Sequence, residues 1–217
     1  MNFELKIRNI VLVGAFDIFG FDRYFFIKNG IVTDEQITDK SVFLPQLVQL
    51  VTPTVQLIIN PAQFIINSIK TDDKGDEVAQ MLLKILSLTK NYMLSGSGIN
   101  FNWFVEGESE QSLAQFSRSL CFNNSNAIQK SFFDEKDATF GFYSSKDALN
   151  CRLKLDVKPI RYKTNEMTDE KSVLQFEFNF HRDYRDPETD KKHLETILKD
   201  YNKYRDESEK IMSLIKK

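Results

Sequence analysis

Two segments in the last third of the chain alternate strictly between apolar and polar side chains. Residues 151–158 and residues 174–181 each carry an apolar side chain at every second position. Because a period of two places successive side chains on opposite faces of a strand, each segment predicts a strand with one dry face and one solvated face. Such strands are typical of antiparallel sheets that are covered on one side only. The pattern therefore predicts an α+β fold that is mainly an antiparallel sheet with one wet face.

The first part of the chain predicts hairpins. Asn29-Gly30 stands between the apolar runs 24–28 and 31–33. This dipeptide between apolar runs favours a type I′ turn, in which both central residues need a positive φ. A second hairpin is predicted over residues 55–66, where Pro61 interrupts the ladder because it has no N–H to donate. Residues 1–70 are therefore expected to be rich in strands.

The middle of the chain predicts a helix, a strand and a shorter helix. Asp76 is an N-cap candidate, and apolar side chains recur at helical spacing after it as far as Tyr92. The serines and glycines of residues 95–98 are expected to end this helix. Residues 99–105 return to a period of two, and a second helix is predicted from Ser109.

The last predicted element is one long helix that begins at Asp186-Pro187. Proline suits the first helical position because its missing N–H would have no intrahelical partner there. The apolar stripe of this helix consists of Leu194, Ile197, Leu198, Tyr201, Tyr204, Ile211, Met212 and Ile215. The sheet is thus expected to be covered by a long C-terminal helix and one mid-chain helix. We expect a single α+β domain over residues 1–217, with a strand-rich part, 1–70, and a strand-helix core with the C-terminal helix, 71–217.

Composition and charge narrow the range of partners. The 217 residues contain 29 Lys and Arg against 31 Asp and Glu, a net charge of −2. Overall charge therefore gives no attraction to nucleic acid or to acidic membrane surfaces. The chain has no signal-peptide pattern at its start and no run of about eighteen apolar residues, the length that a membrane helix needs. We expect a soluble, cytoplasmic protein with no membrane partner, whose Cys121 and Cys151 stay reduced.

Catalytic and metal-binding motifs give only weak signals. His181 and His193 are the only histidines, and no histidines or cysteines have metal-ligand spacing. Glu106, Glu108 and Glu110 form an acidic cluster, which we interpret as complementing the N-terminus of the following helix rather than holding a cation. We therefore predict no catalytic residue, no metal ligand and no cofactor. An enzyme whose site is assembled only in space stays open as an alternative.

The strand from residue 151 and the residues after it carry the one pattern with a mechanistic argument for nucleic acid. Cations share the wet face of the predicted strand, and two more cations and a tyrosine follow Pro159. Such cations can neutralise phosphates and the tyrosine ring can stack on a base, although lysine and arginine also decorate ordinary solvated strands. The candidate nucleic-acid residues are Arg152, Lys154, Lys158, Arg161, Tyr162 and Lys163.

Aromatic residues are dense in residues 16–26. In a strand, the adjacent Phe25 and Phe26 would point to opposite faces, so one ring would need cover beyond a single core. A protein partner or an overlying helix of the same chain would provide this cover, and Tyr24, Phe25 and Phe26 are the candidate partner contacts. The sequence therefore favours a non-enzymatic protein-interaction or assembly module that forms a homodimer or a hetero-complex. Nucleic-acid binding is the alternative.

Overall fold

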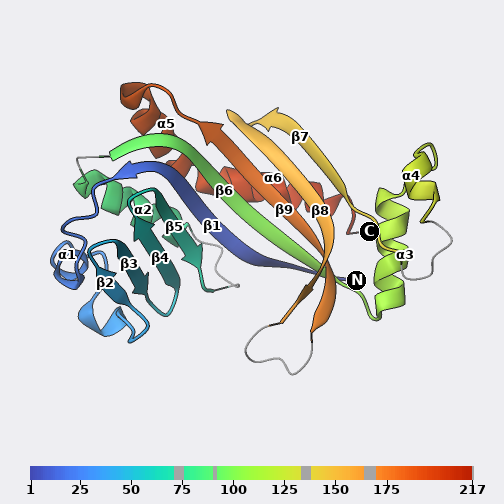
Figure 1. Ribbon diagram of the computed structural model, residues 1–217, viewed down its shortest axis with the longest axis horizontal. Coiled ribbons are helices and arrows are strands. Elements are labelled where there is room, and N and C mark those ends of the chain that lie inside the picture. The colour runs from blue at the N-terminus through green and yellow to red at the C-terminus, as the bar shows by residue number, and fades with distance from the viewer. Residues whose placement is uncertain (71–75, 90–91, 133–137, 164–169, 217) are drawn as a thin grey trace.

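One antiparallel sheet organises the part of the chain that the structure describes, which is residues 1–70, 76–89, 92–132, 138–163 and 170–216. In this computed structural model, nine strands of the described residues join in antiparallel pairs (Figure 1). From one edge to the other, they are β2 (Val42–Leu44), β3 (Leu47–Val51), β4 (Val55–Asn60), β5 (Gln63–Ser68), β1 (Asn2–Phe16), β6 (Tyr92–Glu106), β9 (Lys171–Asp183), β8 (Cys151–Tyr162) and β7 (Phe142–Ala148). The predicted α+β fold is confirmed.

The two central strands, β1 and β6, divide the sheet into two wings. We call β2 to β5 the N-terminal wing, and β9, β8 and β7 the C-terminal wing. In the N-terminal wing, alternate side chains are buried as the period of two predicts; on β4 these are Val55, Leu57 and Ile59. The predicted hairpin over residues 55–66 is formed by β4 and β5 and is confirmed.

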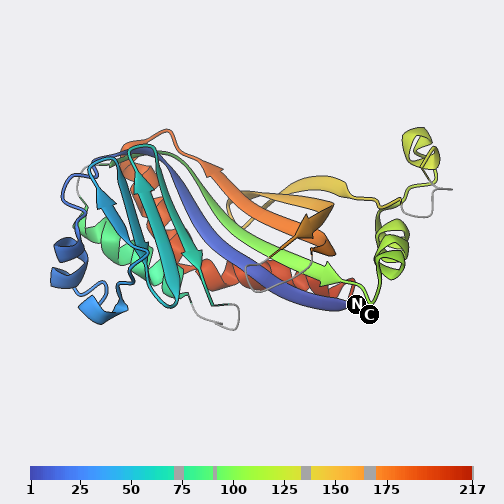
Figure 2. The same cartoon turned by 60° about the horizontal axis from the view of Figure 1, so that its bottom comes forward.

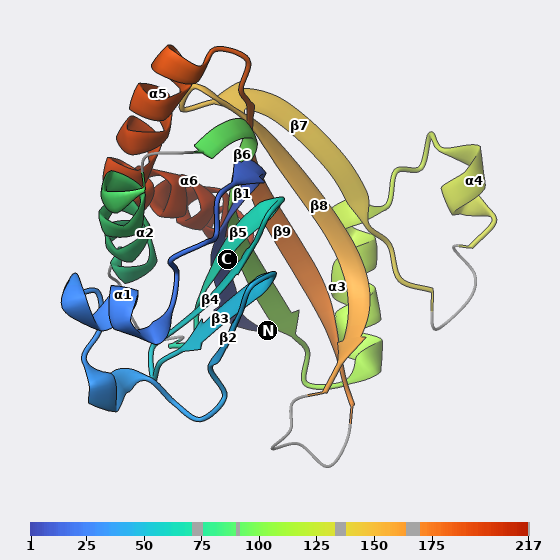
Figure 3. The same ribbon diagram turned by 60° about the vertical axis from the view of Figure 1, so that its left-hand side comes forward.

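The helices of the described residues are α1 (Arg23–Lys28), the short 3-10 helix η1 (Asp34–Gln36), α2 (Glu77–Leu88), α3 (Glu110–Cys121), α4 (Ala127–Lys130), α5 (Pro187–Lys199) and α6 (Tyr201–Ser213). Of these, α2, α5 and α6 cover one face of the sheet, and Figure 3 shows them on the same side of the strands. Figure 1 looks onto the other side, which we call the open face, and α2, α5 and α6 lie behind the sheet in this view. The predicted sheet with one wet face is thus confirmed.

The predicted apolar stripe of the C-terminal segment is the surface that packs on the sheet. Its buried members are Leu194, Ile197, Leu198, Tyr201, Tyr204 and Met212. The ring of Tyr201 contacts that of Phe101 on β6, and the ring of Tyr204 contacts that of Phe180 on β9, with centroids 5.4 and 5.1 Å apart. These contacts attach α6 to the middle of the sheet.

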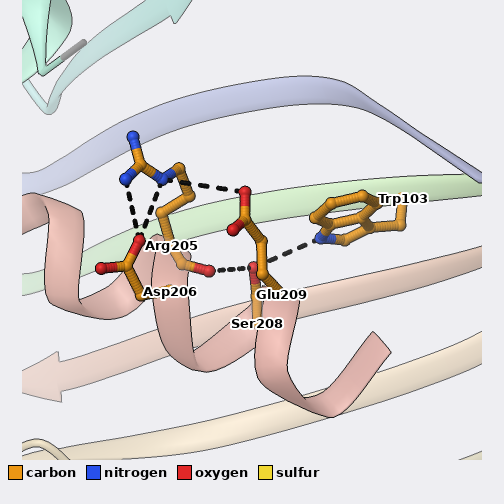
Figure 4. A network of polar contacts seen from close by, with 5 residues as sticks. All are labelled: Trp103, Arg205, Asp206, Ser208 and Glu209. Carbon is orange, nitrogen blue, oxygen red and sulfur yellow. Dashed lines mark hydrogen bonds and ion pairs between the residues drawn. The ribbon is translucent and has the colours of Figure 1, made fainter. Parts of the chain in front are cut away.

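A polar contact also fixes α6 to β6. The indole N–H of Trp103 donates to Oγ of Ser208 at 3.2 Å, and this hydroxyl donates to the carbonyl of Arg205 at 2.7 Å (Figure 4). Arg205 also forms ion pairs with Asp206 and Glu209. Ser208 and Trp103 are both buried. Because a buried indole N–H needs an acceptor, Ser208 sets the position of α6 along the strand.

The hairpin predicted at Asn29-Gly30 is wrong, because these residues end helix α1. The N–H of Gly30 donates to the carbonyl of Ile27 at 2.9 Å. The N–H of Ile31 donates to the carbonyl of Phe26, also at 2.9 Å. This pair of bonds is a Schellman motif, in which the residue after the helix needs a positive φ, and Gly30 has a φ of 59°. The same dipeptide suits a hairpin turn and a helix end, so local sequence does not distinguish them.

The serines and glycines of residues 95–98 lie inside β6 and do not end a helix. Helix α2 ends at Leu88, and Tyr92, which the helical spacing includes, begins β6. A Cβ atom on Gly98 would lie 3.0 Å from Nδ2 of Asn179 on the next strand. The glycine therefore makes room for a neighbouring side chain, a requirement that arises only when the strands pair.

The single long C-terminal helix is also corrected, because it is divided at Asp200. Helix α5 ends before this residue and α6 begins after it, and Asp200 has a ψ of 12° instead of the roughly −42° of an α-helix. Helix α5 packs on α2 as well as β6, whereas α6 packs on β6. Two different surfaces therefore set the directions of the two halves.

The shorter helix predicted from Ser109 is confirmed as α3. The side chain of Ser109 accepts a hydrogen bond from the N–H of Ser112 at 3.1 Å, which is an N-cap contact. Helix α3 contacts β9 at the end of the C-terminal wing. None of the helices in the described ranges is both long and apolar enough to cross a membrane.

Candidate interaction surface

A row of amide side chains crosses the open face. Asn9 on β1, Asn100 on β6 and Asn179 on β9 are register partners. Nδ2 of Asn100 donates to Oδ1 of Asn9 at 2.6 Å, and Nδ2 of Asn179 donates to Oδ1 of Asn100 at 2.5 Å. The middle of the open face is therefore polar, and its amides bind one another.

On the C-terminal wing, the open face carries the first part of the predicted basic row. Arg152, Lys154 and Lys158 all lie on this face of β8, as predicted. Nζ of Lys158 lies 2.9 Å from Oδ2 of Asp156 and 3.0 Å from a second carboxylate, on β9, and these contacts raise the pKa of Lys158. Nη1 of Arg152 lies 3.1 Å from Oδ1 of Asp147. Carboxylates of the chain thus neutralise two of these three cations.

The other candidate nucleic-acid residues do not continue this row. Arg161 lies on the opposite face of β8, and Lys163 is exposed beyond the end of the strand. The ring of Tyr162 packs against that of Phe104, with centroids 5.0 Å apart, and its hydroxyl donates to Oε1 of Glu106 at 2.8 Å. Burial and this hydrogen bond raise the pKa of Tyr162 to about 12. The six described candidates therefore do not form one continuous positive stripe.

Of the aromatic residues predicted to contact a partner, two are covered within the chain. Phe26 is fully buried, and Phe25 is half-buried with its ring against that of Phe26, at 5.4 Å between centroids. Because residues 23–28 are helical, adjacent side chains point about 100° apart, and the premise that the two rings face opposite sides of a strand is wrong. Tyr24 is 66% exposed, and partner binding through it stays a prediction.

The strand β7 is the outer edge of the C-terminal wing, and the alternating pattern does not predict it. It pairs with β8 over seven residues, from Phe142↔Val157 to Ala148↔Cys151, in unbroken register. Residues 143–147 are exposed in succession. Within the described ranges no strand pairs with the outer side of β7. It therefore presents backbone N–H and C=O groups that another chain can pair with.

A type I′ turn at Leu149-Asn150 joins β7 to β8. The φ values of these two residues are 52° and 60°. The hydroxyl of Tyr204 donates to the carbonyl of Leu149 at 3.0 Å, and Nη1 of Arg182 donates to the carbonyl of Asn150 at 2.7 Å. Leucine rarely adopts a positive φ, so this turn has no recognisable dipeptide in the sequence. Asn150, which tolerates this conformation, is the local signal from which the hairpin could have been suspected.

A short arm, residues 126–132, projects near the start of β7. Helix α4 stands apart from the sheet in Figures 1, 2 and 3, and none of its residues is buried. Two large apolar side chains of the arm are exposed, Ile128 by 74% and Phe132 by 55%. Exposed apolar side chains on a projecting element are typical of contact sites.

Burial keeps the thiols and the nearby tyrosines protonated. Sγ of Cys151 lies 4.0 Å from the hydroxyl of Tyr204, and the hydroxyl of Tyr184 shares a hydrogen bond with Oγ of Ser97 at 2.8 Å. Burial raises the pKa of Cys151 and Tyr204, raises that of Tyr184 to about 12 and raises that of Cys121 to about 11. Both cysteines are free, and a thiol with a raised pKa is a poor nucleophile.

The members of the acidic cluster have separate partners. Glu106 accepts from Tyr162 and lies 3.3 Å from Nζ of Lys171. Burial alone would raise the pKa of Glu106, but these hydrogen bonds outweigh it and lower the pKa. Oε1 of Glu110 accepts from Oγ of Ser172 at 2.9 Å. Among the residues with a described position, no three His, Cys, Asp or Glu side chains are grouped so that they could hold a metal ion.

Comparisons with known proteins assign no family to the chain: a scan against protein-family models finds no match, and a search of the curated proteins finds no similar sequence. Function is therefore inferred from the geometry of the chain itself.

Proposed function

We propose that this protein is a protein-interaction module that binds an extended segment of a partner along the outer edge of β7. In this mode the partner adds one strand to the sheet, so that backbone hydrogen bonds supply affinity and alternate side chains supply specificity. The observation that carries the proposal is the seven-residue, unbroken β7 with residues 143–147 exposed.

β7 lacks most of the sequence features that usually protect the edge of a sheet against strand pairing. Edges are commonly blunted by proline, bulges, very short strands or lysines that project along the edge. β7 contains no proline and no register shift. Its lysine, Lys146, belongs to the helix-covered face, where its Nζ lies 3.3 Å from Oε1 of Glu207 on α6. This lysine therefore projects from the helix-covered face, and its side chain is 58% exposed.

The turn indicates which backbone groups of β7 face outward. In a hairpin with a two-residue turn, the residues that flank the turn form a hydrogen-bonded pair, and such pairs alternate along the ladder. Here the flanking residues are Ala148 and Cys151. We therefore expect the N–H groups of Tyr143, Ser145 and Asp147 to face away from β8 and toward a partner strand.

Apolar anchors accompany this edge. The ring of Tyr143, on the open face of β7, is 62% exposed. The arm that carries Ile128 and Phe132 precedes β7 in the chain and lies near its start (Figure 1). Because a few aromatic and apolar side chains usually carry most of the binding energy of an interface, these residues are the expected anchors.

The proposal is tested with substitutions at Ser145. Both changes remove the hydroxyl of Ser145, which accepts a hydrogen bond from Nη2 of Arg152 on β8 at 2.6 Å. Ser145→Pro also removes an outward N–H without removing a backbone bond to β8, whereas Ser145→Ala keeps the N–H. The probes are linear peptides selected from a displayed random library against the natural chain. They should bind the alanine variant with unchanged affinity and the proline variant at least about tenfold more weakly. This factor is the expected effect of losing about one neutral backbone hydrogen bond.

Amide hydrogen exchange locates the bound peptide. On binding, the amides of Tyr143, Ser145 and Asp147 should become protected, and those of β2 at the other edge should not. Peptides that bind both variants equally, or that protect amides away from β7, would contradict the proposal. Sedimentation at high concentration tests whether a second copy of the chain takes the same place, because a β7-mediated homodimer would also be lost in Ser145→Pro.

Nucleic-acid binding through the basic row is the alternative, and the ion pairs of Arg152 and Lys158 give it less support. The double change Arg152→Glu with Lys154→Glu should leave the melting temperature almost unchanged, because surface ion pairs contribute about 0–1 kcal/mol. If the alternative holds, the natural chain binds oligonucleotides at low salt and the double variant does not. The raised pKa values of the two thiols likewise give less support to an enzymatic role that uses a cysteine nucleophile.

A further inference from the structure

A cavity of about 700 Å³ lies between α3 and the ends of β8 and β9. Its volume falls in the range of roughly 300–1,000 Å³ that is typical of small-molecule sites. Its apolar lining residues, which we call the floor, are Leu113, Ala114, Pro159, Ile160 and Val173. Leu113, Ala114 and Val173 are buried, whereas Pro159 is exposed and Ile160 is half-buried. A ligand in this cavity therefore meets the apolar surface of Pro159 and Ile160.

The cation of this cavity is Arg161, which is exposed at the rim. Within the residues that the structure describes, its guanidinium has no hydrogen bond and no ion pair. By contrast, one cation in each of two other cavities has an ion pair: Lys199 lies 3.6 Å from Glu195, and Lys203 lies 2.9 Å from Asp200. The charge of Arg161 is thus available to a ligand.

We propose that this cavity binds a small amphipathic monocarboxylate, with its apolar tail on the floor and its carboxylate at Arg161. The planar fork of arginine matches a carboxylate in a bidentate arrangement. Gln111 and Thr139 add an amide and a hydroxyl to the rim. Glu110 also lines the rim, where its carboxylate accepts a hydrogen bond from Ser172 at 2.9 Å. Because the rim has one unpaired cation and already has one carboxylate, it suits a singly charged anion better than a phosphate.

The proposed site goes beyond the peptide-binding proposal and does not depend on it. Arg161 belongs to the face of β8 opposite the open face, near the end of the strand farther from the turn with β7. Peptide selection on β7 and ligand binding in this cavity can therefore succeed or fail separately.

Titration calorimetry with octanoate and with neutral 1-octanol tests the proposal. The natural chain should bind both probes, and Arg161→Gln should weaken octanoate binding by about 10- to 100-fold, the usual effect of losing a charged hydrogen-bond pair, while leaving 1-octanol binding unchanged. Arg185→Gln is the matched control, because Arg185 is also an exposed arginine but does not line the cavity. It should bind octanoate like the natural chain.

Three outcomes would overturn the proposal. One is that the natural chain does not bind octanoate. Another is that Arg161→Gln binds it with unchanged affinity, which would show that the arginine does not contact the carboxylate. The third is that Arg185→Gln loses as much affinity as Arg161→Gln, which would show a general effect of surface charge.

Discussion

The two edges of the sheet differ in how they are protected. At one edge, β2 has three residues, and Pro45 follows it in the turn to β3. At the other edge, β7 has seven residues in unbroken register with β8. A very short edge strand with an adjacent proline gives a partner strand little to pair with. The comparison indicates that the edge at β2 is protected against strand pairing, whereas the edge at β7 is accessible.

The two wings also differ in how they are covered. Aromatic residues that precede the N-terminal wing in the chain cover it: the ring of Phe21 lies 5.7 Å from that of Phe64, and the ring of Phe26 lies 6.0 Å from that of Phe43. The C-terminal wing is covered by α5 and α6, from the end of the chain. The first wing is thus covered by residues that precede it in the chain, whereas the second depends on helices that follow it.

Removal of residues 187–217 tests this dependence and has the largest expected effect. The deletion removes six buried apolar side chains, and the burial of each contributes about 1.5–3 kcal/mol to the free energy of unfolding. The summed loss is comparable to the whole stability of a typical domain, roughly 5–15 kcal/mol. We expect the cooperative melt to be lost and the amides of β8 and β9 to lose protection before those of β4 and β5. An unchanged melt would show that the helices are an appendage.

Alanine substitutions at two glycines compare the centre of the sheet with its C-terminal edge. A Cβ atom on Gly14 would lie 2.0 Å from the carbonyl oxygen of Met93, and one on Gly141 would lie 2.0 Å from that of Val157. Each clash should cost about 1–3 kcal/mol or more. Gly14→Ala should lower the melting temperature of the whole chain, whereas Gly141→Ala should mainly detach the start of β7.

Gly96→Ala is the control for both glycine variants, because the nearest atom to its Cβ would be 3.4 Å away. It should leave the melting temperature close to that of the natural chain. Equal losses of melting temperature in all three variants would show that these positions need the backbone flexibility of glycine, and that the close approach of the neighbouring strand is not the reason for glycine there.

Ser208→Ala tests the contact between α6 and β6 with a smaller expected effect. The change leaves the buried indole N–H of Trp103 without its acceptor, which should cost about 1–3 kcal/mol. Trp103 is the only tryptophan, so its fluorescence reports directly on this contact. Ser213→Ala on the same helix is the matched control, because the exposed Ser213 also donates to the carbonyl three residues earlier. The control should keep the natural fluorescence and melting temperature.

The hydroxyl of Tyr162 gives the smallest expected effect, and it concerns the far end of the C-terminal wing. Its pKa is raised from 10.0 to about 12, so the folded chain binds this proton more tightly than the unfolded chain. The resulting stability is present below pH 10 and is lost as the pH rises toward 12. Tyrosinate absorbance of the natural chain minus that of Tyr162→Phe should show this late titration. A titration at the ordinary value would contradict the contact with Glu106.

Local periodicity is sufficient to predict which side of several elements faces the core. The alternation of β8 and β9 and the stripe of α5 and α6 follow from backbone geometry alone, so they could be predicted before any pairing was known. The placement of Arg152, Lys154 and Lys158 on one face follows for the same reason. The proximity of Asp156 to Lys158 could also have been predicted, because the two residues are two positions apart on that face.

Tertiary structure decided the features that depend on distant residues. Gly30 and Gly98 are compatible with several local structures, and only the contacts around them select a helix end for one and a strand interior for the other. The position of β7 at an edge depends on strand order, and the cavity beside Arg161 depends on where α3 meets β9. Short-range geometry orients side chains along one element, but pairing and packing between elements determine which edges and cavities remain accessible to a partner or ligand.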